Sequence, residues 1–342
     1  MAAKSSPESF RDIVHDHNGF LVSPLQWTSR FLDLVGCRFE DVGTPPVNTE
    51  STQNDHRNND GQTPHSASKS DTELLAMNPS PVAKRRHLMN ILVGKERTFE
   101  YFREGALFYF HGRSVHRPEY LMFLRREEDH IHNDPPPLVG YVHYTSVNRD
   151  RRRQFEPFPG PRGNHNDIGM RICLKRITKT SPKNWTEDPY FICHLLALAQ
   201  YQERKLNLSK STTYTVSRLS LFPLHLSVAI QLIRFRSRLL VTNVLDREGI
   251  LYYEAQITTE PLNVLKNPKG ATSPINWPTI RHKKITYKPY DTFPSRLVAE
   301  LVTPSPLSSC GLSNPSGDAT GTKRPHEQQD DESCKQRRIS ES

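Results

Sequence analysis

The strongest pattern of hydrophobic positions along the chain spans 188–205 and predicts a helix. Its apolar side chains recur at helical spacing and form one wide face, made of Phe191, Ile192, Leu195, Leu196, Leu198 and Ala199. Asp188 can cap this helix, and Pro189 suits its first position. A charged run at 203–205 ends the pattern.

Shorter runs rich in aromatic and aliphatic residues predict strands on both sides of this helix. They lie at 106–110, 120–124, 138–144, 239–244 and 250–258, and the last two flank a turn and predict a hairpin. Segments 88–102 and 260–265 are typical of helices, 168–177 of a short strand or helix, and the basic stretch 145–166 of a loop. This order of elements indicates an α+β fold, a small mixed sheet with packed helices.

Two stretches are almost free of large apolar residues and predict disorder. One is an internal loop or linker at 43–83, and the other is the C-terminal tail at 304–342. Neither can bury enough surface to offset the entropy lost on ordering. We therefore expect one α+β domain at 84–303.

The N-terminal segment 1–42 has a hydrophobic stretch that predicts a helix at 24–35, ending near Gly36. Such a short helix is not stable alone, so we expect the segment to dock on the main domain.

An apolar stretch at 216–236 separates the long helix from the hairpin. Its longest apolar run, 219–233, is 15 residues long and is interrupted by Pro223, His225 and Gln231, whereas a membrane span needs about 20. We therefore expect no membrane association. A genuine buried insertion and a retained intron translated in frame both stay open.

Residues 188–200, 239–243 and 251–258, followed by Leu262 and Leu265, resemble an uncharacterised filamentous-fungal protein family. The resemblance covers about 140–268. It implies an α+β module and transfers no activity or site residues.

Composition and charge indicate the compartment that the protein suits and the kinds of cysteine site that it lacks. The chain has 342 residues and a net charge of +9, and only 35% of its residues are apolar. Residues 43–81 carry net −3 and 304–342 carry net −1, so the remainder carries +13. The N-terminus lacks an apolar signal core, and the five cysteines are scattered at 37, 173, 193, 310 and 334. These features favour a reducing compartment and neither a disulfide framework nor a cysteine-based metal site.

The tail contains two basic clusters separated by ten residues. Lys323 and Arg324 form the first, and Lys335, Arg337 and Arg338 form the second. This spacing resembles a bipartite nuclear import signal, which predicts a nuclear location and an import carrier as partner. The alternative is a solvated charged tail.

Ser340 follows the second basic cluster and resembles a site for kinases that prefer basic residues. A phosphate there would add about −1.5 to −2 charge beside the cluster and weaken cation-driven import.

The predicted loop at 145–166 contains a cluster of cations near two aromatic residues, Phe155 and Phe158. The cluster consists of Arg149, Arg151, Arg152 and Arg153. These cations could contact nucleic-acid phosphates, with stacking by the aromatic rings. The sequence favours a solvated basic loop, or a strand edge paired with the acids at 127–129, over this interpretation, since no nucleic-acid-binding motif accompanies the cluster.

One enzymatic interpretation stays open. Asp246, Glu254 and Gln256 have the spacing of a magnesium-dependent nuclease of the PD-(D/E)xK type. Asp246 is equally an ordinary turn residue and Glu254 an ordinary strand residue.

Taken from the sequence, the first interpretation is a non-enzymatic nuclear interaction or regulatory protein without cofactor. Nucleic acid and another nuclear protein are both open as its partner. The alternative is the magnesium-dependent nuclease. The histidines do not have metal-site spacing, so we expect no metal outside that alternative.

Overall fold

The computed structural model describes residues 9–16, 23–43, 69–94, 97–126, 138–214 and 234–303. The predicted import signal, Ser340, the tail and most of the 216–236 stretch lie outside these residues. So does the part of the predicted linker that precedes residue 69.

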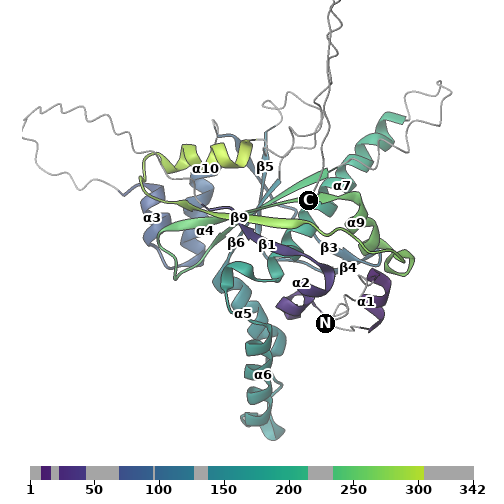
Figure 1. The fold of residues 1–342 in the computed structure, drawn as a ribbon. Coiled ribbons are helices and arrows are strands. Elements are labelled where there is room, and N and C mark those ends of the chain that lie inside the picture. The colour runs from purple at the N-terminus through teal and green to yellow at the C-terminus, as the bar shows by residue number, and fades with distance from the viewer. Residues whose placement is uncertain are drawn as a thin grey trace, which may run out of the picture. The chain divides into compact units, whose positions relative to one another are not determined.

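The described strands form a seven-stranded mixed sheet in the order β1-β9-β8-β7-β6-β5-β2 (Figure 1). These strands are β1 Arg38–Asp41, β2 Phe99–Phe102, β5 Leu121–Arg125, β6 Leu138–His143, β7 Arg234–Thr242, β8 Gly249–Thr258 and β9 Thr279–Thr286. The pairs β1–β9 and β6–β7 are parallel, and the others are antiparallel. A small second sheet pairs β3 Phe108–Phe110 with β4 Arg113–His116.

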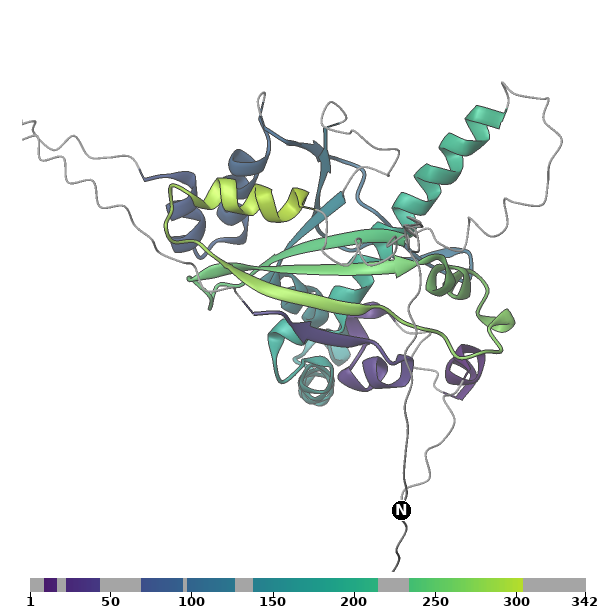
Figure 2. The same cartoon turned by 45° about the horizontal axis from the view of Figure 1, so that its top comes forward.

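Helices cover both faces of the large sheet (Figure 2). They are α1 Phe10–Asp16, α2 Ser29–Val35, α3 Asp71–Met77, α4 Pro81–Leu92, α5 Tyr144–Phe155, α6 Asp167–Thr180, α7 Tyr190–Tyr214, α9 Thr259–Lys266 and α10 Phe293–Val302. Side chains of α1, α2, α5, α7 and α9 join one core cluster, and those of α3, α4 and α10 join the other. Alternate residues of β7 supply the two clusters, because Leu239 and Val241 enter the first and Leu240 the second.

The predicted α+β fold is confirmed. The helix capped by Asp188 is α7, and the predicted hairpin is β7–β8. The sheet is wider than the sequence indicated, since β1 and β9 extend it beyond the hairpin.

The basic stretch after β6 was expected to be a loop, and this prediction is wrong over α5. Its buried residues are Tyr144, Val147, Arg151 and Phe155, spaced three and four apart. This spacing is helical, but an arginine occupies one buried position, so the apolar pattern alone does not reveal the helix. Segment 88–102 also differs from the prediction, because α4 ends at Leu92 and the chain then forms β2.

The disorder predicted over 43–83 is wrong for residues 69–83, which form α3 and the start of α4. The Ser70 hydroxyl accepts a hydrogen bond from the Glu73 N–H and caps α3. Leu75 and Ala76 are buried, and the buried Lys84 ammonium donates to the Leu75 carbonyl at 2.5 Å. Most residues around α3 are polar, so the sequence pattern does not reveal that Leu75 and Ala76 pack in the core.

Residues 23–43 contribute packing and an edge strand. The predicted helix at 24–35 is a 3-10 turn at Pro24–Gln26 followed by α2, which ends where Gly36 adopts a left-handed φ of 74°. The Trp27 ring stacks on Phe31 at 4.1 Å between centroids. The chain then enters β1, whose Arg38 pairs in register with Thr279 of β9.

No helix within the described ranges combines the length and the hydrophobicity that crossing a bilayer requires.

Candidate nucleic-acid interface

Helices α5 and α6 extend away from the large sheet (Figure 1). We name residues 144–183 the α5–α6 arm. The arm contains ten basic and three acidic residues, a net charge of +7 in a chain whose total is +9. Most of the charge excess of the protein therefore lies on this short part of the chain.

Nine of the ten basic side chains of the arm are exposed: Arg149, Arg152, Arg153, Arg162, Arg171, Lys175, Arg176, Lys179 and Lys183. Three of the four predicted phosphate contacts are among them. Arg149 also forms an ion pair with Glu119 at 2.8 Å and one with Asp150 at 3.3 Å. The exposed cations are therefore accessible to an anionic partner. At Arg149 such a partner would compete with the carboxylates of Glu119 and Asp150.

Arg151 is the exception, and its predicted contact with nucleic acid is wrong. No part of its side chain is exposed, because its guanidinium forms a two-point ion pair with the buried Asp188. The two hydrogen bonds are 2.7 and 2.5 Å long. A phosphate has no access to this guanidinium.

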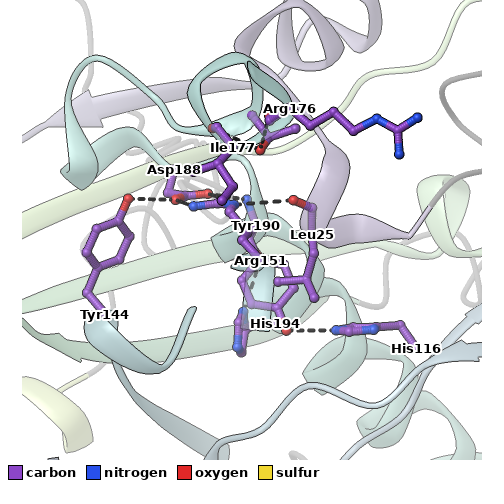
Figure 3. Close-up of polar contacts among 10 residues, drawn as sticks. Leu25, His116, Tyr144, Arg151, Arg176, Ile177, Asp188, Tyr190 and His194 are labelled. Atoms are coloured by element: carbon purple, nitrogen blue, oxygen red, sulfur yellow. Dashed lines mark hydrogen bonds and ion pairs between the residues drawn. The ribbon is translucent and has the colours of Figure 1, made fainter. Parts of the chain in front are cut away.

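The buried carboxylate of Asp188 organises several elements (Figure 3). Besides Arg151, it accepts hydrogen bonds from the Tyr144 hydroxyl at 3.0 Å and from the Tyr190 N–H at 2.9 Å. Arg151 in turn donates to the Leu25 carbonyl at 3.2 Å. These bonds tie α5, the start of α7 and the N-terminal segment together.

The electrostatics of this network keep the Arg151 guanidinium charged. Burial alone lowers the pKa of Arg151, but the hydrogen bonds and charge of Asp188 outweigh it and raise the pKa above its usual value. Burial and the neighbouring Asp188 carboxylate raise the pKa of Tyr144, so its hydroxyl stays a donor. The network therefore anchors the arm.

The two aromatic residues of the predicted cluster have different positions. Phe155 is buried on α5, whereas Phe158 is 89% exposed. The Phe158 carbonyl accepts a hydrogen bond from the Asn166 amide at 2.9 Å, which holds the loop between α5 and α6. Phe158 alone of this pair can stack on a base.

A second group of polar residues lies beside the anchor, at the start of α7 (Figure 3). His116 Nε2 lies 2.7 Å from the Tyr190 hydroxyl, and His194 Nδ1–H donates to the Tyr190 carbonyl at 3.0 Å. Burial lowers the pKa of His116 to about 4 and that of His194 to about 3. Both rings are neutral at physiological pH.

The residues of the nuclease alternative are each engaged in separate structural contacts. Asp246 pairs with Lys284 at 2.8 Å and accepts the Glu248 N–H in its turn. Glu254 accepts from the Tyr252 hydroxyl at 2.7 Å and from Arg238 Nε at 3.3 Å.

Asp246 precedes β8, whose first residue is Gly249. Glu254 lies five residues further along this strand, about 16 Å from Gly249. Gln256 lies 3.5 Å from a nitrogen of Arg234. In the part of the chain that the structure describes, no three histidine, cysteine, aspartate or glutamate side chains are grouped as metal ligands. Cations already neutralise the two carboxylates, which favours structural roles for both.

The comparisons found no family model, no curated protein and no solved structure that matches this chain.

Proposed function

We propose that this protein is a non-enzymatic nuclear interaction protein whose α5–α6 arm binds the phosphate backbone of nucleic acid. The observation that carries the proposal is the arm's nine exposed cations, set against three acidic residues. Neutralising phosphates releases condensed counterions, which favours binding without sequence-specific contacts.

The cations of α6 have a spacing that suits an extended anion. Arg171, Lys175 and Lys179 follow one another at intervals of four residues, so they lie along one side of the helix about 6 Å apart. All three side chains are exposed. Phe158 adds an exposed ring that a single-stranded base can stack on.

The nuclear location rests on the two basic clusters of the tail, which supply the charge pattern that an import carrier recognises. Lys323, Arg324, Lys335, Arg337 and Arg338 are the residues that we assign to carrier binding.

A nuclear protein is the second candidate partner, favoured by exposed apolar side chains on α6. Ile168, Ile172 and Leu174 are 73%, 49% and 57% exposed. A nucleic acid bound through its own phosphate backbone would leave these apolar side chains uncovered. An acidic protein with apolar side chains would cover them and pair with the cations.

The test is the salt dependence of binding to fluorescein-labelled single-stranded and duplex DNA, followed by anisotropy. In the triple variant Arg171→Gln/Lys175→Gln/Lys179→Gln, the slope of log K against log salt should fall by about 2 to 3. A matched control removes three exposed cations elsewhere, as Arg38→Gln/Arg86→Gln/Lys269→Gln.

Absent or salt-independent binding by the wild type would remove nucleic acid from the proposal and leave the protein partner. An equal loss in the control variant would show that net charge, rather than the arm, drives binding.

A further inference from the structure

A cleft of about 570 Å³ lies at the end of β6, where the chain enters α5. The first turns of α4 and α5 and the start of β5 also line it. Its size suits a small molecule rather than a single ion.

Four arginines from four separate segments line this cleft: Arg85, Arg103, Arg117 and Arg149. The acidic residue among the lining side chains, Glu119, pairs with Arg149 at 2.8 Å. Arg85 lies 3.5 Å from the Tyr101 hydroxyl, and neither Arg103 nor Arg117 forms an ion pair with a residue that the structure describes. Like charges repel one another, so this convergence indicates an anionic ligand.

The His143 ring also lines this cleft and carries a buried, unpaired nitrogen within the described part of the chain. Only 4% of the residue is exposed. The Thr145 N–H donates to Nδ1 at 3.2 Å, so the neutral ring carries its proton on Nε2. Nε2 is buried and has no hydrogen-bond partner within the described part of the chain.

Burial, and then the charge of Lys84, lowers the pKa of His143 to about 4. The ring therefore stays neutral at physiological pH, and Nε2–H is available as a donor. An unpaired buried donor is costly, so a ligand oxygen that reached Nε2 would stabilise the complex.

The start of α5 strengthens the preference for an anion. His143 is the N-cap of this 12-residue helix, and Ser146 of its first turn lines the cleft. The positive end of the helix dipole and a hydroxyl donor therefore face the same space as the arginines.

We infer that this cleft binds a phosphate monoester of nucleotide size, with Arg85, Arg103 and Arg117 around the phosphate and His143 and Ser146 at its base. Tyr120, Tyr141 and Val142 line the remainder, where they can pack against the body of the ligand. This site is distinct from the α6 cations that the DNA-binding test removes, because Arg85, Arg103 and Arg117 lie outside residues 144–183; Ser146 and Arg149 belong to both the arm and the cleft.

The test measures binding to the full chain by calorimetry, with inorganic phosphate, adenosine 5′-monophosphate and adenosine as probes at constant ionic strength set by chloride. We expect saturable binding of phosphate and the monophosphate and none of adenosine. Tighter binding of the monophosphate than of phosphate would support recognition of the body. Equal binding would overturn the nucleotide-size part of the inference, because the site would then recognise the phosphate alone.

The variant Arg85→Gln/Arg103→Gln should weaken the binding of both anions by about tenfold or more, because it removes two charge-assisted contacts. The matched control is Arg86→Gln/Arg113→Gln, which removes two exposed arginines outside the cleft and should keep wild-type affinity. Ser146→Ala, a small change in the lining of the cleft, should weaken binding of both anions. Its circular dichroism spectrum should match that of the wild type, because the fold is kept.

Absence of binding at millimolar phosphate or monophosphate, or equal affinity in the Arg85/Arg103 variant, would overturn the inference. Neither result depends on DNA binding by the arm, which the α6 variant tests separately.

Discussion

Arg151 and Asp188 form a two-point ion pair in which neither side chain has any exposed surface. The two residues are 37 positions apart, and their pair joins α5 to the start of α7. A cation in the middle of a basic cluster thus acts as the anchor of the arm, while its neighbours Arg152 and Arg153 stay exposed.

Replacing Asp188 by Asn should strongly destabilise the fold. The change leaves Arg151 as a buried charge without its counter-ion, which typically costs about 3–5 kcal/mol. The free energy of unfolding from urea titration measures this. Asp33→Asn, at an exposed position of α2, should change stability by less than about 0.5 kcal/mol.

The double variant Arg151→Met/Asp188→Leu should lose less stability than Asp188→Asn, because it removes both charges together. If the loss of stability in the double variant equalled the sum of the losses in Arg151→Met and Asp188→Leu, the two residues would not be a coupled ion pair.

Stability should fall as the pH falls below 6.5, in part through His194. Burial lowers its native pKa from 6.5 to about 3. Between these values the unfolded state binds a proton that the native state does not, so the stability that His194 contributes above pH 6.5 is lost towards pH 3. In His194→Gln, the slope of unfolding free energy against pH should be shallower by about 1.4 kcal/mol per pH unit between pH 6 and 4.

The control for this slope is His165→Gln, at an exposed histidine whose side chain is 70% accessible. It should leave the slope close to that of the wild type. An unchanged slope in His194→Gln would show that the ring titrates equally in both states.

Glu254→Gln should reduce stability and have no effect on nucleic-acid cleavage. Burial alone raises the pKa of Glu254, but the Tyr252 hydrogen bond and the charges of Arg238 and Arg236 lower it below its usual value. Loss of this carboxylate removes a counter-ion of the buried Arg238, and we expect a cost of about 2–3 kcal/mol.

Glu100→Gln, at an exposed strand position, is the matched control and should be close to neutral. Magnesium-dependent cleavage of DNA by the wild type, lost in Glu254→Gln with stability intact, would reinstate the nuclease interpretation.

The proposed import signal predicts that a fluorescent fusion of the full chain concentrates in the nucleus. Changing Lys335, Arg337 and Arg338 to Ala should abolish the accumulation, and Ser340→Asp should reduce it by adding negative charge beside the second cluster. Changing the neutral Gln328, Gln329 and Gln336 to Ala is the control. A cytosolic wild-type fusion would contradict the import proposal.

The sequence by itself determined the elements whose signals are local. The apolar repeat after Asp188 is enough to place the start of α7, although the helix continues to Tyr214, beyond the charged run at 203–205. The turn at 246–249 between two apolar runs is enough to predict the hairpin of β7 and β8. Both patterns reflect backbone periodicity, which a window of ten to twenty residues contains.

Only the tertiary structure decided what the charged residues do. Arg151 is buried because α7 brings Asp188 to it, and four arginines share one cleft because α4, α5 and two connecting segments meet there. β1 joins the sheet through β9, whose residues lie about 240 positions further along the chain. Contacts of this kind depend on how distant segments pack, and local sequence patterns do not predict which distant segments come together.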